Sequence, residues 1–143
     1  MKYVILILVA LNLVACGVKR DNPLDPNSHS EIVVPGDVAG LAGEAFGSGS
    51  NPRYVRLEWN SNNLYNTDGY YVYRSLGYYN AYAVIDTVLH ATGTTIQTYI
   101  HSSENDNSVS PGDFWYKVSA YKSYSGGNLE GRMSMPVFVR VSN

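Results

Sequence analysis

The chain has 143 residues, a formal net charge of −2, and charged side chains at only 15% of its positions. This length fits one domain, and the lack of any block of like charge excludes nucleic acid as a partner recognised through a basic patch. The sequence contains 13 tyrosines but a single cysteine, Cys16, so no disulfide can form within the chain.

The N-terminal segment has the layout of a secretory signal peptide. A short positive start, Met1-Lys2, precedes an apolar run that is unbroken from Tyr3 to Leu11 and continues with small and apolar residues to Ala15. A helix that crosses a bilayer needs about 20 apolar residues, and this stretch is shorter. We therefore predict that residues 1–15 are a signal peptide that is removed from the mature protein.

The end of this segment, Leu13-Val14-Ala15-Cys16, resembles the lipobox of bacterial lipoproteins. In that family the Cys thiol receives a diacylglycerol and the signal peptidase cuts before it. The resemblance implies that Cys16 is lipidated and anchors the mature chain in the bacterial cell envelope. Gly17 follows the cysteine, which is similar to lipoproteins exported to the outer membrane where the host has two membranes. The alternatives are an ordinary secretory signal with an incidental cysteine, or an uncleaved anchor.

A polar segment connects Cys16 to the first predicted strand. It is rich in Asp, Asn, Ser and Pro, and it has neither a helical nor an alternating period. Pro23 and Pro26 restrict the backbone, so we expect residues 16–35 to be the lipidated cysteine and a flexible, partly stiff tether. The acidic residues lack the spacing of a calcium-binding loop, and we expect no metal or other cofactor.

The remaining residues, 36–143, contain short stretches with the pattern of β-strands. In the two clearest stretches, apolar and polar side chains alternate; these stretches run from Tyr54 to Trp59 and from Phe114 to Tyr121. The other predicted strands span residues 38–42, 70–75, 82–88, 94–100 and 137–141. Seven strands without a helical window predict an all-β protein, a β-sandwich.

Five segments in this region carry a family resemblance: Pro35 to Leu41, Val55 to Trp59, Gly69 to Ser75, Pro111 to Tyr121, and Gly131 to Val137. Their order and spacing resemble a fibronectin type III domain. The resemblance implies a seven-stranded immunoglobulin-like sandwich, with sheets of three and four strands and with Trp59, Tyr116 and Val118 in the core. Where the family places a tyrosine before the sixth strand, this chain has Phe114.

No motif in the sequence indicates catalysis. His29, His90 and His101 lack the spacing of a zinc site or of a nucleophile system, and we expect all three to face solvent. A small sandwich also offers no deep cleft for carboxylates with shifted pKa values. We therefore expect no enzymatic activity; a small carbohydrate-processing accessory enzyme is the least favoured class.

Two tyrosine-rich connections are the candidate binding sites. Residues 78–82 follow the third predicted strand, and residues 121–128 follow the sixth. Loops of Tyr, Ser, Gly and Asn combine large contact area with adaptable hydrogen bonds. The candidate residues are Tyr78 and Tyr79 at one end, and Tyr124, Ser125, Gly126, Gly127 and Asn128 at the other. We favour the second set, because a glycine pair beside an aromatic residue predicts an exposed, adaptable loop.

The predicted function is therefore that of a lipid-anchored envelope lipoprotein. Its domain binds a protein or a glycan at the cell surface or in the periplasm. The alternative is a structural spacer or assembly subunit with no ligand of its own. Fold resemblance does not decide between them, because one fold serves many functions.

Overall fold

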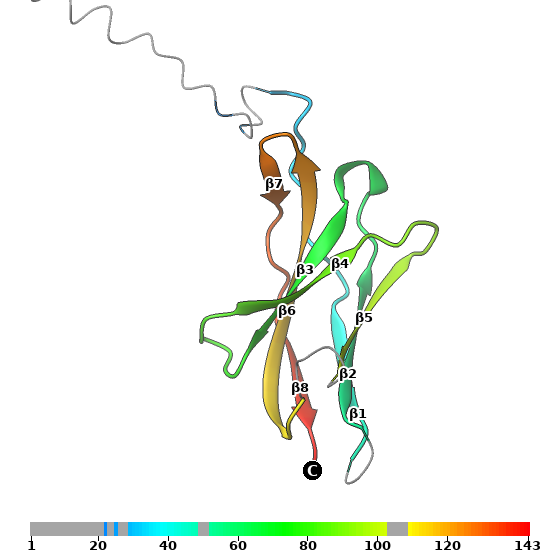
Figure 1. Ribbon diagram of the computed structural model, residues 1–143, viewed down its shortest axis with the longest axis vertical. Coiled ribbons are helices and arrows are strands. Elements are labelled where there is room, and N and C mark those ends of the chain that lie inside the picture. The colour runs from blue at the N-terminus through cyan, green and yellow to red at the C-terminus, as the bar shows by residue number, and fades with distance from the viewer. Residues whose placement is uncertain (1–21, 23–24, 26–28, 49–51, 103–108) are drawn as a thin grey trace, which may run out of the picture.

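The computed structural model describes residues 22, 25, 29–48, 52–102 and 109–143; the predicted signal peptide and Cys16 lie outside the described residues. Two antiparallel sheets face each other (Figure 1). The first has the order β1-β2-β5, with β1 Ala42–Phe46, β2 Tyr54–Asn60 and β5 Ile96–Ser102. The second has the order β4-β3-β6-β7, with β4 Ala83–Leu89, β3 Gly69–Ser75, β6 Gly112–Tyr124 and β7 Gly127–Glu130; β8, Val137–Val141, also pairs with β6.

The core lies between the sheets and follows the alternation in the sequence. Val55, Leu57 and Trp59 of β2 are fully buried, as are Tyr116 and Val118 of β6. The predicted β-sandwich and its predicted core residues are therefore confirmed. A short 3₁₀ turn, η2 Leu64–Asn66, precedes β3, and no helix in the described part of the chain is long and apolar enough to cross a membrane.

The long strand β6 has two different partners along one edge. Its first five residues pair with β8, and its last four residues pair with β7. Between these two ladders Ser134 bridges the edge, because its N–H donates to the Val118 carbonyl at 2.8 Å and its hydroxyl accepts from the Val118 N–H at 3.0 Å. Because the bonds to β8, Ser134 and β7 follow one another along this edge, β6 stays in one sheet over its length. Its side chains therefore form one row on each face of that sheet.

Two features of the predicted strand pattern are wrong. The described residues contain eight strands rather than seven, because Gly127–Glu130 forms β7 although its glycine and asparagine predict a turn. The first strand begins at Ala42 rather than near Val38. A Cβ added at Gly43 would lie 2.8 Å from Val139 Cγ2 and 2.9 Å from Leu57 Cδ2, so any larger residue would force these core side chains to move.

The prediction for His101 is also wrong, because this side chain is fully buried on β5. The Tyr116 hydroxyl lies 2.9 Å from its Nδ1, and an Arg74 guanidinium nitrogen lies 3.4 Å from its Nε2. Because these polar groups lie within reach of both ring nitrogens, the imidazole can be buried without leaving its nitrogens unpaired. His29 and His90 are partly buried rather than fully solvent-facing. The Tyr116 hydroxyl thus links β6 to β5, while Phe114 is buried without a polar contact of that kind.

Candidate functional surfaces

Four aromatic side chains form a continuous row on the outer face of the larger sheet, which we call the aromatic strip: Tyr78, Tyr79, Trp115 and Phe138. Their ring centroids lie 4.8 Å apart for Tyr78 and Tyr79, 5.0 Å apart for Tyr78 and Trp115, and 5.1 Å apart for Trp115 and Phe138. Tyr79 is 94% exposed, and Tyr78 and Phe138 are each 41% exposed. Leu76, also exposed, precedes the two tyrosines in the β3–β4 connection.

Strand pairing explains why these rings meet. Trp115 lies directly opposite Ser75 of β3 and opposite Phe138 of β8. Because neighbours on each strand point inward, Trp115 and Phe138 point outward together. The two tyrosines follow β3 in sequence, so the β3–β4 connection brings them to the same end of the sheet.

Cationic side chains border the strip. The Lys117 ammonium lies 4.3 Å from the centroid of the Tyr82 ring, and the Arg140 guanidinium lies 5.7 Å from the centroid of Phe138. Arg140 also donates two hydrogen bonds to the Asp113 carboxylate, at 2.7 and 2.8 Å. This pairing lowers the pKa of the Asp113 carboxyl group below its usual value. The strip therefore combines aromatic contact area with a fixed cation at its edge.

Further along the same face the polar groups bond to one another. Tyr73 and Ser119 both donate to the Glu130 carboxylate, and the Asn128 side chain donates to the Tyr71 hydroxyl at 2.7 Å. These polar groups are therefore satisfied within the protein, and Val84 and Leu89 of β4 add further exposed apolar side chains to this face.

The second candidate set lies in the hairpin between β6 and β7, and residues 125–128 are exposed there. Tyr124 ends β6, Ser125 and Gly126 form a two-residue turn, and Gly127 and Asn128 begin β7. Gly127 has a φ of 129°, a backbone conformation that favours glycine. Tight pairing across a short turn restrains these residues, because Tyr124 lies directly opposite Gly127.

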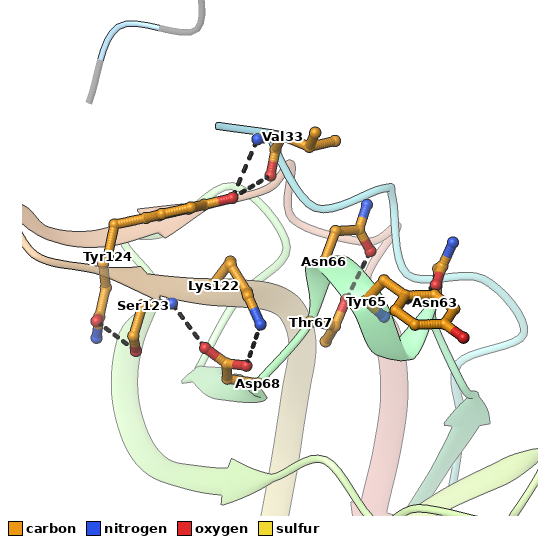
Figure 2. A network of polar contacts seen from close by, with 10 residues as sticks. Val33, Asn63, Tyr65, Asn66, Thr67, Asp68, Lys122, Ser123 and Tyr124 are labelled. Carbon is orange, nitrogen blue, oxygen red and sulfur yellow. Dashed lines mark hydrogen bonds and ion pairs between the residues drawn. The ribbon is translucent and has the colours of Figure 1, made fainter. Parts of the chain in front are cut away.

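The Tyr124 hydroxyl already has a partner in the N-terminal segment (Figure 2). It accepts a hydrogen bond from the Val33 N–H at 3.0 Å and donates to the Val33 carbonyl at 3.3 Å. We call this contact the tether clamp. Ile32, the preceding residue, is buried. Tyr124 therefore holds the chain at the point where it leaves the domain.

A charged network lies beside the clamp, as Figure 2 shows. The Lys122 ammonium donates to the Asp68 carboxylate at 2.5 Å, and the Ser123 N–H donates to the same carboxylate at 2.9 Å. The hydrogen bond from Lys122, with that from Ser123, lowers the pKa of the Asp68 carboxyl group below its usual value. These contacts fix the end of β6 to the residues that precede β3.

The two candidate surfaces lie at opposite ends of the second sheet. Trp115 is near the start of β6 and Tyr124 is its last residue, so nine residues of extended strand, about 30 Å, separate them. In Figure 1 the N-terminal segment lies beside the β6–β7 hairpin, away from the β3–β4 connection and from β8. The structure therefore does not combine Tyr78 and Tyr79 with Tyr124 in one patch.

Tyr78 and Tyr79 are predicted from the sequence as candidate residues, whereas Trp115 and Phe138 are not. Both missed residues carry a signal, because each is a large aromatic residue at an outward position between inward-facing neighbours. That signal does not identify β6 and β8 as neighbouring strands. Their pairing is seen only in the sheet topology. Among the residues that the structure describes, no cluster of three or more His, Cys, Asp or Glu side chains is placed to hold a metal ion.

The two facing antiparallel sheets define an immunoglobulin-like β-sandwich of the fibronectin type III kind. Among solved structures, the chain is similar to an Fn3-like protein from Clostridium thermocellum, with a TM-score of 0.52 and 21% sequence identity. The match covers 78% of this chain and 94% of that chain, and it supports the fold. Comparison with protein-family models gives no match, and comparison with curated protein sequences gives none either.

Proposed function

We propose that the protein is a lipid-anchored envelope lipoprotein whose fibronectin type III-like domain binds a partner through the aromatic strip. The observation that carries the proposal is the contiguous row of exposed rings at the end of the domain opposite the tether clamp. Contiguous exposed aromatic surface on a small domain is typical of an interaction site. A tether that leaves from the opposite end keeps this surface accessible.

The chemistry of the strip favours a protein partner over a glycan. Tyr, Trp and Arg are the residues most enriched at the centres of protein interfaces; the strip contains the first two, and Arg140 lies at its edge. The rings meet at steep angles, 75° between Tyr78 and Tyr79 and 86° between Tyr78 and Trp115. Such rings present edges and corners rather than one flat platform on which a sugar ring stacks.

We predict that replacing Cys16 with Ser removes the membrane anchor. The variant lacks the thiol that receives lipid, so it should appear in the soluble fraction or remain unprocessed in the membrane. The measurement is fractionation of cells that produce each form, with detection of the chain and of its size. A Cys16→Ser protein that is processed and stays membrane-bound like the parent would contradict lipid anchoring.

A second prediction concerns the strip itself. Trp115→Ala and the double variant Tyr78→Ala/Tyr79→Ala should each weaken partner binding by about 2 kcal/mol, the loss typical of a central interface aromatic. The partner is first captured by cross-linking on intact cells and identified by mass spectrometry. Its affinity for each variant is then measured with purified proteins.

Tyr54→Ala is the matched control, because Tyr54 also lies in an aromatic pair, stacked on Phe46 at 5.0 Å, but on the other sheet. It should leave binding unchanged, and thermal melts should show that all variants are folded. Loss of binding with Tyr124→Ala but not with the strip variants would move the site to the hairpin. Unchanged binding in every variant would favour the alternative, a spacer with no ligand of its own.

A further inference from the structure

The end of the domain that carries the tether clamp also exposes apolar side chains. Tyr65 of η2 is 90% exposed and Leu64 beside it is 50% exposed. Val33 and Val34, at the clamp, are about half exposed. The N-terminal segment packs against the η2 region, because the Asn62 side-chain amide donates to the Gly36 carbonyl at 2.8 Å. These four apolar side chains therefore lie at one end of the domain, which we call the clamp end.

The local structure fixes the two exposed residues of η2. The Asn63 side chain accepts a hydrogen bond from the Tyr65 N–H at 3.0 Å, which caps the short turn. Leu64 and Tyr65 are thus held outward on a defined turn, and their exposure is a property of the folded domain. Figure 2 shows this turn near the segment that continues from Val33.

The length of chain before the clamp limits how far this end can lie from Cys16. Ile32 is the sixteenth residue after Cys16. Sixteen residues span at most about 55 Å when fully extended. A lipid on Cys16 would therefore keep the clamp end close to the bilayer at a high effective concentration.

We propose that the clamp end rests on the phospholipid bilayer, with Leu64 and Tyr65 in the headgroup region; this inference rests on the proposed lipidation of Cys16. Tyrosine is enriched at membrane interfaces, because its ring is apolar and its hydroxyl reaches water. At this end the Asp68 carboxylate is paired with Lys122, which reduces its repulsion from anionic headgroups. In this orientation the aromatic strip faces away from the membrane.

The test uses the lipidated mature chain in vesicles of phosphatidylethanolamine and phosphatidylglycerol. Because lipid occupies the thiol of Cys16, a cysteine introduced by Leu64→Cys is the only free thiol and can carry a polarity-sensitive fluorophore. The matched control is Leu76→Cys. Both leucines are exposed and lie in connections at opposite ends of β3. Lipids carrying nitroxide quenchers near the headgroup report contact with the bilayer.

We expect blue-shifted emission and several-fold stronger quenching at position 64 than at position 76. Adding Tyr65→Ser to the Leu64→Cys chain should reduce this difference, and thermal melts establish that each labelled chain is folded. Equal, solvent-like emission at both positions on vesicle-bound protein would overturn the inference while leaving the anchor intact. Chain that fails to float with the vesicles and has an unmodified Cys16 would overturn the proposed lipidation, and this inference with it.

Discussion

Trp59→Ala should destabilise the domain by about 3–5 kcal/mol, because truncating a buried Trp loses its transfer free energy and leaves a cavity. Trp59 is fully buried on β2, and its ring meets the Tyr70 ring edge-on at a centroid distance of 5.1 Å. Small domains are stable by only about 5–15 kcal/mol, so the loss is a large share of the total. Denaturant melts of the purified domain measure it.

The second Trp of the chain provides the matched control. Trp115 lies on the outer face of β6 and is only partly buried, so Trp115→Ala should move the denaturation midpoint far less. A similar shift for both substitutions would show that the outer face of the second sheet contributes as much to stability as the interior between the two sheets. That result would contradict a core confined to the space between the sheets.

Stability should fall as the pH rises above about 10, the usual pKa of tyrosine. Burial raises the pKa of Tyr73 to about 12, with a further contribution from its hydrogen bond to Glu130. Burial also raises the pKa values of Tyr99 and Tyr116 well above the usual value. Above pH 10 these tyrosines ionise more readily in the unfolded chain, so their contribution to stability is complete below that pH and is lost as the pH rises through the folded-state pKa.

Denaturant midpoints between pH 8 and pH 12, together with tyrosinate absorbance, measure this effect. Tyr116→Phe isolates one contribution: the variant should lose less stability than the parent as the pH rises above 10, because it has one fewer group to ionise on unfolding. Tyr79→Phe, which changes a fully exposed ring, should follow the parent curve. Parallel curves for the Tyr116 variant and the parent would contradict the burial of that hydroxyl.

Much of the fold follows from alternation in the sequence, and the exceptions have physical causes. In β2 the inward positions are apolar, and in β6 those from Phe114 to Ala120 are apolar, so the buried face of each strand can be predicted. In β7 the first two residues are Gly127 and Asn128, which are unfavourable in strands, and pairing along the edge of β6 overrides that preference. His101 lies at the end of β5, and its burial depends on polar partners from β3 and β6 that no local pattern predicts.

The candidate site was predictable only in part. Tyr78 and Tyr79 stand out as adjacent aromatic residues in a connection, whereas Trp115 and Phe138 belong to strands far apart in the sequence. The glycines beside Tyr124 also favoured this residue as a binding-site candidate. Local composition cannot predict that its hydroxyl bonds to the backbone of Val33, 91 residues away in the sequence.

Intact-mass analysis of the mature protein purified from the envelope tests the proposed lipid anchor. We expect a chain that begins at Cys16 and carries the added mass of a diacylglycerol, with or without a further acyl group. A mature chain with an unmodified Cys16 thiol, or with the segment before Cys16 still attached, would contradict it.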